Sequence, residues 1–530
     1  MPTFSGRLAV AVALVAVVFG AANLMAAGPE GRYLVLYQGP GQVDRGLVEA
    51  HGHKIAQDLG DAGVLVVQST NPADLAALPG VEAVATDSPR IAVPPNEKAE
   101  PLAVPAAPSS GCASTGGSCD LQWDLARIHV PQAWQVTQGS SRVKVAVLDT
   151  GLRSTHEEVG PNYDIAESRS FVQPTQFCAD DATTFSSIED FNGHGTWTGL
   201  HIAGKNGAFM TGIAPRTTLV NVRVLGACGF GFDSWILNGM LYANQVGARV
   251  ISMSLGGYLC ASGVVPGSFY CGTAADVGTD PATWQVYVRV IDYLRQHGTV
   301  VIAATGNEHV RLDERGRVIS AGTLAFNSLG PDPANDLRGL SELPAGVPGS
   351  VAVAALNRVT AEGTAGQTAF GQYGVGRRDQ LTYYSSYGER VDVSAPGGAR
   401  NFNIPNFDCL VGACGRLGNT TVNPADNPGD FGAWGSCDNC YVFIQGTSMA
   451  TPQVAGVAAL ALAAHPRLDS DALVGLLRDA VTDFRNPDAT PPIAGNPASP
   501  LYNFDVNYGG RPIDNDLMGS GVIDAAKSVR

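Results

Sequence analysis

The sequence carries little charge, and that charge is unbalanced. Charged residues make up 15% of the 530 residues, hydrophobic residues make up 45%, and the net charge is −15. No run rich in Lys and Arg occurs, so the basic face that nucleic-acid binding requires is missing. The high hydrophobic fraction excludes disorder for most of the chain. The length exceeds one ordinary core and indicates two or three cooperating units.

Long hydrophobic runs are also missing, and we expect no segment that spans a bilayer, which takes roughly 20 residues. The apolar stretch Leu8–Phe19 is shorter than that, follows Arg7 and precedes small residues. This order is typical of an export signal, which we place at residues 1–27. A retained membrane anchor is the alternative, and the short apolar run disfavours it. The signal indicates a secreted or periplasmic product.

Cysteine is absent from the first 110 residues, so the N-terminal segment must fold without disulfides. The ten cysteines that follow indicate disulfides in an exported protein. Their pairing is not fixed by the sequence, and pairs close in sequence, such as Cys260 with Cys271, are the simplest guess. The last four also have a spacing that suits zinc, but an oxidising compartment favours two disulfides. These four are Cys409, Cys414, Cys437 and Cys440.

After the signal, the chain divides into a small unit, a linker and a large block. The small unit, residues 28–93, has a helix signal at Asn71 and is expected to form an α+β domain. Residues 94–118 are rich in Pro, Ala and Ser and are expected to form an exposed, cleavable linker. The strand-like segments of the small unit are Tyr33–Tyr37, Val64–Gln68 and Val81–Ala85.

The large block, residues 119–530, alternates strands with helices such as Trp235–Gln245 and Thr283–Gln296. Its strand candidates are continuous runs of β-branched and small residues, which are typical of a parallel sheet covered on both faces. The pattern predicts an α/β fold: a doubly wound, mostly parallel sheet with helices on both faces and surface insertions near 310–349 and 397–440. The strand candidates are Val143–Leu148, Thr218–Val224, Arg249–Ser254, Thr299–Ala304 and Ser350–Ala355.

Two short segments contain an acid and a base in suggestive positions. Asp149 ends a buried strand, where catalytic groups of α/β sheets gather, although an Asp before a Gly is more often a turn residue. His194 lies between Gly193 and Gly195, which let the backbone crowd the imidazole at a helix start. A lone His is more often structural, so neither segment decides the function alone.

A third segment, Gly446–Pro452, contains Ser448. Pro452 fits the first turn of a helix, and Val454–Ala464 is apolar or small all round, which indicates a buried helix. Ser448 is therefore expected at the positive end of that helix, beside N–H groups that can stabilise an oxyanion.

The chain order Asp149, His194, Ser448 matches one order known for hydrolytic triads. In such a triad the His takes the proton of the Ser, the Ser attacks a carbonyl carbon, and the Asp orients and stabilises the imidazolium. No G-x-S-x-G segment occurs in the chain, which disfavours an esterase or lipase.

These three segments resemble the signatures of the subtilase family, and the resemblance runs from about Leu121 to Val529. It implies a serine endopeptidase that cleaves peptide bonds through an acyl-enzyme. It also implies that the side chain of Asn307, in Ala304–Asn307, donates a hydrogen bond in the oxyanion hole. Without the other motifs, Asn307 would be read as a turn residue after a strand.

The resemblance implies substrate-binding strands as well. Ser254, Leu255 and Gly256 resemble the strand that pairs with the substrate backbone and lines the primary specificity pocket. Gly229 and Gly231 lie in a segment that resembles the strand on the opposite side. Backbone pairing on both sides implies broad specificity. The absence of the Trp and acidic residues of the dibasic-cleaving branch disfavours a prohormone processor.

Residues 28–93 resemble the family's propeptide, which chaperones folding and then inhibits, and an unrelated accessory domain is the alternative. Cleavage is then expected between Val93 and Asp120. The segment Trp197–Leu200 departs from the family's His, Val, Ala, Gly, but these positions pack a helix, so we expect activity. His201 is expected to be structural.

No cofactor is expected for the chemistry. The loop Lys205–Thr211 is short and offers only the amide of Asn206, which disfavours a strong calcium site there and leaves open a structural calcium site elsewhere.

We therefore expect an exported, monomeric serine endopeptidase that frees itself from its inhibitory propeptide and acts on proteins or peptides. Nucleic acid and a stable membrane anchor are not expected among its partners. Two other classes stay open: a binding or scaffolding protein with an unused triad, and a hydrolase or transferase that uses the same triad on another acyl substrate.

Overall fold

The computed structural model describes residues 31–91, 100–101, 122–175, 178–205, 210–259, 274–320, 337–356, 381–382, 384–398, 430–435, 438–482 and 515–530. Several sequence-based expectations fall outside these residues: the export signal, most of the linker, Asn206, the Cys260–Cys271 pair, and most of the insertion near 397–440 with three of its cysteines.

A nine-stranded sheet forms the centre of the large block, in the order β21-β22-β18-β16-β13-β11-β7-β9-β8. All neighbouring strands in it are parallel except the edge pair β21–β22. The five predicted strands are present as β7 (Lys144–Asp149), β9 (Thr218–Arg223), β11 (Val250–Met253), β13 (Val300–Ala304) and β16 (Val351–Leu356). The other strands of the sheet are β8 (Arg169–Ser170), β18 (Val393–Pro396), β21 (Val481–Thr482) and β22 (Val522–Ile523).

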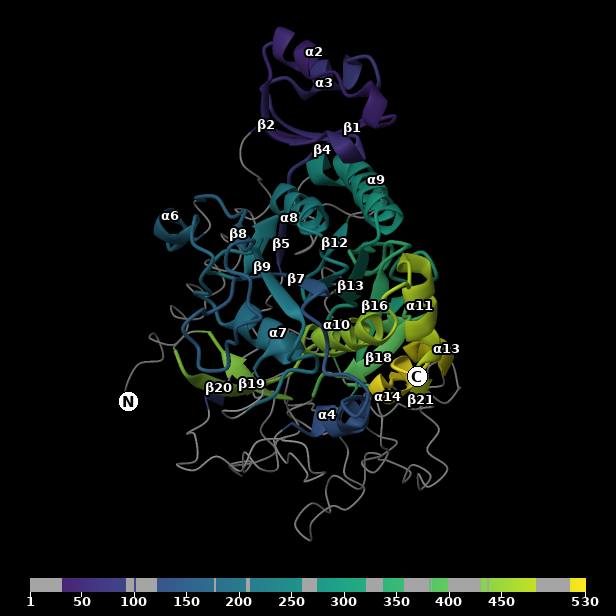
Figure 1. Ribbon diagram of the computed structural model, residues 1–530. Helices are drawn as coiled ribbons and strands as arrows, with labels where there is room; N and C mark the ends of the chain where they lie inside the picture. Colours follow the sequence, from purple (N-terminus) through teal and green to yellow (C-terminus); the bar gives the residue numbers. More distant parts are fainter. Residues whose placement is uncertain are drawn as a thin grey trace, which may run out of the picture.

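Helices cover both faces of this sheet, as the continuous apolar strands predicted (Figure 1). Along β7 the side chains alternate between two cores: Val145 and Val147 belong to one, and Ala146 and Leu148 to the other. The first core contains residues of α7 (His194–Ala203) and α10 (Thr447–Ala464). The second contains residues of α8 (Asp233–Gln245) and α9 (Ala274–Gln296). The doubly wound α/β fold is confirmed.

The helix α10 crosses the first core and begins earlier than the sequence indicated. Pro452 was expected in its first turn, but the helix starts at Thr447 and Pro452 lies inside it. Among the helices of the described residues, α10 alone is long and apolar enough to cross a membrane, contrary to the expectation of no such segment. Because 89% of that stretch is buried inside the protein, α10 is a core helix of the folded domain.

The small unit at residues 31–91 is an antiparallel sheet in the order β2-β3-β1-β4. One face of this sheet carries α2 (Arg45–Ala50) and α3 (Pro72–Ala77), and Asn71 caps α3 as predicted. The other face joins the core formed by α8 and α9 (Figure 1). Its strands are β1 (Arg32–Tyr37), β2 (Lys54–Leu59), β3 (Val64–Gln68) and β4 (Val81–Thr86).

Short elements complete the surface of the molecule. Beside the site lie β5 (Pro89–Ile91), β6 (Glu100–Pro101), β10 (Phe230–Phe232), β12 (Gly257–Leu259), β15 (Ser341–Leu343), β19 (Asp430–Trp434) and β20 (Cys440–Ile444). Elsewhere lie α4 (Trp123–Arg127), α5 (Val130–Ala133), α6 (Asp181–Thr184), α11 (Ser470–Asp479), α13 (Asn515–Met518), α14 (Ala525–Ser528), β14 (Arg311–Leu312) and β17 (Tyr387–Gly388), with short 3-10 turns at Pro40–Gln42 and Gly60–Ala62.

One disulfide joins Cys178 to Cys228, which are 50 residues apart in sequence. Cys440 is also disulfide-bonded. Cys178 and Cys228 are consecutive among the ten cysteines, and the fold brings the segment before α6 against the turn before β10.

Candidate active site

Asp149 ends β7 at the carboxyl edge of the sheet, where its buried carboxylate accepts three hydrogen bonds. The donors are Nδ1 of His194 at 2.7 Å and the backbone N–H of Thr150 at 2.7 Å, both to Oδ1, and Oγ1 of Thr198 at 3.0 Å, to Oδ2. The hydroxyl of Thr198 thus helps to fix the carboxylate against the imidazole. Thr198 is one of the positions that depart from the family pattern, and no sequence pattern predicted its contact with Asp149.

His194 is the first residue of α7, and steric constraints favour glycine at the positions on both sides of it. Gly193 has a φ of 116°, which side-chain-bearing residues rarely adopt. A Cβ at Gly195 would lie 2.2 Å from the carbonyl oxygen of Gly151, so no larger residue fits there. The expected crowding of backbone around the imidazole is present, and it brings α7 directly onto the turn after β7.

Asp190 holds this arrangement together and was missed by the sequence reasoning. Its buried carboxylate accepts five hydrogen bonds. The donors to Oδ1 are Oγ1 of Thr150 and the N–H groups of Asn192 and Gly193, and the donors to Oδ2 are the N–H and Oγ1 of Thr196. Because these donors come from both sides of the site, Asp190 ties the turn after Asp149 to the start of the helix that carries His194.

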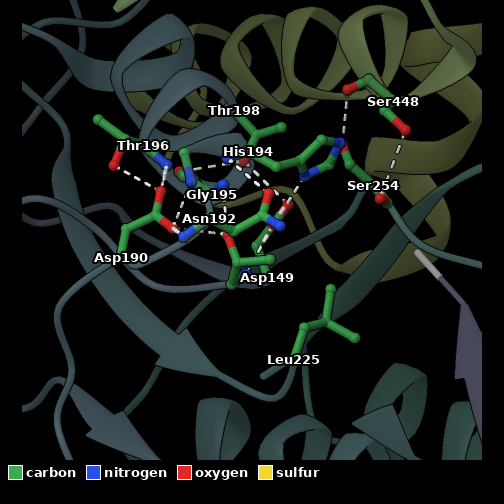
Figure 2. A network of polar contacts seen from close by, with 12 residues as sticks. Asp149, Asp190, Asn192, His194, Gly195, Thr196, Thr198, Leu225, Ser254 and Ser448 are labelled. Atoms are coloured by element: carbon green, nitrogen blue, oxygen red, sulfur yellow. Dashed lines mark hydrogen bonds and ion pairs between the residues drawn. The ribbon is translucent and has the colours of Figure 1, made fainter. Parts of the chain in front are cut away.

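Ser448 lies in the first turn of α10, and Figure 2 shows the imidazole of His194 between Asp149 and Ser448. Pro452 has no N–H to donate to the carbonyl oxygen of Ser448, four residues before it. Oγ of Ser254 donates to that oxygen instead, at 2.7 Å. The contact fixes the helix start against the end of β11 and explains how a proline is accommodated inside α10. Ser448 is 2% exposed, whereas His194 and Asp149 are 0% exposed.

Asn307 follows β13 and faces the same helix start. Its Oδ1 accepts hydrogen bonds from the N–H of Thr447 at 2.8 Å and from Oγ1 of Thr447 at 3.0 Å. Because the backbone N–H can only donate, these contacts assign the oxygen to this side and turn the amide nitrogen away from Thr447. Asn307 is therefore held rigidly next to Ser448 by a backbone N–H of the helix N-terminus, which has no acceptor within the helix itself.

His309 lies two residues further on and is buried with a φ of 53°. Burial lowers the pKa of its imidazole to about 4, with a backbone hydrogen bond at Ser385 acting in the opposite direction. The ring is therefore neutral at neutral pH.

The predicted substrate strands lie at the carboxyl edge of the sheet. Ser254 and Leu255 directly follow β11 and are buried, and Gly256 precedes β12. On the opposite side, Gly229 has a φ of 81° and leads into β10, which contains Gly231. The edge of β10 pairs antiparallel with β5 of the N-terminal unit, with Gly231 opposite Arg90. An extended segment of the same chain thus lies along one of the predicted substrate strands.

Trp197, which differs from the residue usual in the family, packs against neighbouring elements. The buried indole of Trp197 forms an apolar cluster with residues of β20 and with Met449 of α10. It also stacks on the ring of His201, with centroids 4.3 Å apart. His201 pairs with the buried carboxylate of Asp124 at 2.6 Å. The larger residue at 197 thus fills the space under the β19–β20 hairpin.

Within the described ranges, no group of three or more His, Cys, Asp or Glu side chains is arranged to hold a metal ion.

Comparison with known proteins agrees with this geometry. The model of the subtilase family matches residues 140–519. Thermitase from Thermoactinomyces vulgaris is 28% identical over 345 residues, which cover 64% of this chain and 81% of thermitase. Subtilisin from Bacillus pumilus is 28% identical over 347 residues, 65% of this chain and 86% of that protein.

Among solved structures, the epidermin leader peptide processing serine protease from Staphylococcus aureus has the same fold. It is 17% identical with a TM-score of 0.63, and the match covers 94% of this chain and 97% of that one. Since the family match spans well over half of the sequence, the chain belongs to the subtilase family and is a subtilisin-like serine peptidase.

Proposed function

We propose that this chain is an exported serine endopeptidase, made as a precursor, with Asp149, His194 and Ser448 as its catalytic triad. The observation that supports this most strongly is the 2.7 Å contact between Asp149 Oδ1 and His194 Nδ1, with Ser448 on the other side of the same imidazole (Figure 2). A carboxylate, an imidazole and a serine in that order form the arrangement that activates a serine for acyl transfer.

The proposed mechanism follows from the roles of these groups. Because the carboxylate of Asp149 accepts from Nδ1, the imidazole keeps Nε2 as its basic nitrogen, which takes the proton of Ser448 as Oγ attacks the peptide carbonyl carbon. The negative oxygen of the tetrahedral intermediate is stabilised by the amide of Asn307 and the N–H of Ser448 at the helix N-terminus. The imidazolium then gives its proton to the leaving amine, and water hydrolyses the acyl-enzyme by the same steps.

We propose that the N-terminal unit is an inhibitory propeptide. Its strand β5 occupies the edge of β10, where a substrate strand would pair. Its Asp87 accepts from the N–H of Ser234 at 2.8 Å and from its Oγ at 2.7 Å, and so caps the N-terminus of α8. Burial raises the pKa of Asp87 to about 6, although Arg32 and Ser234 lower it. These contacts keep β5 on the edge of β10 in the full-length chain.

The proposed domain organisation has the export signal at 1–27, the propeptide at 28–93, a linker with the maturation site at 94–118 and the catalytic domain at 119–530. Two residues of this linker, Glu100 and Pro101, pair as β6 with β20. Cutting within the linker breaks the covalent connection between the unit that occupies the edge of β10 and the unit that contains the triad, so the N-terminal unit can then dissociate from the enzyme.

The proposed product acts outside the cytoplasm as a monomer on proteins or peptides. Its chemistry needs no cofactor, because the triad supplies the nucleophile and the base, and the oxyanion donors supply the electrostatic stabilisation. Backbone pairing along β10 and the segment after β11 makes recognition independent of most substrate side chains.

The proposed function is tested by treating the secreted protein with a serine-directed phosphonate and with casein. We expect the wild type to cleave casein and to be labelled at Ser448, and Ser448→Ala to do neither. Ser528→Ala is the matched control, because its hydroxyl is buried in α14 and donates only to the nearby Ala525 carbonyl. It should behave like the wild type. Intact casein with an unlabelled wild-type protein would refute the proposal.

A further inference from the structure

An arginine of the N-terminal unit lies in a buried acidic pocket of the catalytic unit. Arg90, in β5, donates from Nε to Oδ1 of Asp233 at 2.8 Å and from Nη2 to Oδ2 at 2.8 Å. Both residues are buried, and this paired geometry is the strongest way in which a guanidinium binds a carboxylate. The two residues are 143 positions apart in sequence, so the contact is made across the boundary between the two units.

The side chains that line the pocket around Arg90 all belong to the catalytic unit. Asp233 is the first residue of α8, and the hydroxyl of Tyr287 in α9 donates to its Oδ1 at 2.8 Å. Burial raises the pKa of Asp233, and the charge of Arg90 lowers it. Asp280, also in α9, adds a second negative charge that acts on the guanidinium. Removal of Arg90 would thus leave a buried carboxylate without its counterion, which is costly.

The wall of the pocket leaves room for a long side chain. A Cβ at Gly257 would lie 3.0 Å from Cδ of Arg90, so the glycine there allows the aliphatic part of the arginine to pass. The residue opposite Arg90 in the strand pair is Gly231, which also has no side chain. The pocket therefore suits one long, planar cation by both its shape and its charge.

The position of Arg90 is a substrate position under the proposed function. The strand β5 pairs with β10, and a peptide that follows the same register places one side chain where Arg90 now lies. That side chain lies before the cleaved bond, because the chain continues from β5 towards the expected maturation site beyond Val93.

We infer that the pocket formed by Asp233, Tyr287 and Gly257 selects substrates that carry an arginine at the position paired with Gly231. The inference rests on the proposed function and narrows it: recognition is backbone-based along the groove but selective at this position. Lysine fits less well, because its single ammonium cannot form the two parallel bonds that the guanidinium makes with Asp233.

The test uses the enzyme that matures from the full-length chain and a set of peptides with one cleaved bond. The peptides place arginine, lysine or norleucine at each of the positions two to six before that bond. At one of these positions we expect kcat/KM to be about 10- to 100-fold higher for arginine than for norleucine, with lysine in between. The ratio is taken within one enzyme preparation, so it does not depend on the fraction of active protein.

Asp233→Asn should reduce this ratio to near one, and Tyr287→Phe should reduce it less. The matched control is Asp292→Asn, which removes the same charge from the half-exposed surface of α9 and should keep the wild-type ratio. A wild type that cleaves the peptides without preferring arginine at any position overturns the inference and leaves the proposed function intact. So does an Asp233→Asn enzyme that keeps the preference. A wild type that cleaves none of the peptides and no casein overturns both.

Discussion

Removal of the Asn307 side chain separates its proposed catalytic role from its structural one. In the structure, Oδ1 of Asn307 accepts from the N–H and the Oγ1 of Thr447, and its amide nitrogen is the proposed donor to the oxyanion. Loss of one such donor in subtilisin, a relative of this chain, lowers kcat by about 10²–10³, or about 2.7–4 kcal/mol in the transition state. We expect Asn307→Ala to show a loss of that size with little change in KM.

The same substitution also takes an acceptor from the N–H of Thr447, which costs about 1–3 kcal/mol of stability. The assay is therefore steady-state hydrolysis of a chromogenic peptide, with active sites counted by phosphonate titration. Asn162→Ala is the control, because its amide donates to the carbonyl oxygens of Ala203 and Thr217 and has no role in the proposed chemistry. It should lose stability and keep kcat. A kcat for Asn307→Ala within tenfold of the wild type would refute the assignment.

Two further predictions concern stability and are measured by urea unfolding in the Ser448→Ala background. Burial lowers the pKa of His309 from the ordinary 6.5 to about 4, so the folded state favours the neutral imidazole. This preference contributes stability that is fully present above pH 6.5 and is lost as the pH falls through the folded-state pKa. Between pH 7 and pH 4 the free energy of unfolding should fall by about 3 kcal/mol because of this group. His309→Asn should lack this pH-dependent loss, and asparagine tolerates the φ of 53° at this position. A variant with the same pH dependence as the parent protein would contradict the prediction. Replacing both Cys178 and Cys228 with Ser opens a link between residues 50 apart and should cost about 4 kcal/mol. Equal midpoints for the two proteins would exclude a stabilising disulfide.

The central fold could be predicted because its strands are buried on both faces. The segments that form β7, β11 and β13 are runs of β-branched and small residues, and such runs are compatible with few structures other than a buried strand. In contrast, β2 was not predicted, because its exposed and half-buried residues alternate and include Lys54 and Asp58. Its place in the sheet depends on pairing with β3, which is a tertiary contact.

The start of α10 shows why a local rule can fail. A proline usually marks the first turn of a helix, but here Oγ of Ser254 replaces the missing donor to the carbonyl of Ser448, so the helix extends before Pro452. The two residues that make this contact are 194 positions apart in sequence. No local pattern contains that information.

The candidate triad could be predicted because its residues lie next to glycines or at a helix start. The residues that hold the triad in place have no such local sequence pattern. Asp190 lies in the irregular segment before α7 and has no distinguishing sequence pattern, although its carboxylate accepts five hydrogen bonds in the structure. Arg90 and Asp233 are equally ordinary in sequence, and only the pairing of β5 with β10 brings them together. The sequence thus indicated the proposed reacting groups, and the structure adds the residues that hold them in place.

The most direct test of the central claim is to measure the intact mass and the N-terminal sequence of the secreted protein, with Ser448→Ala beside the wild type. We expect the wild-type protein to begin between residues 93 and 120, and Ser448→Ala to keep the N-terminal unit. If the variant is cut at the same place as the wild type, or if neither protein is cut, then Ser448 does not perform the maturation and the account of a self-processing precursor is wrong.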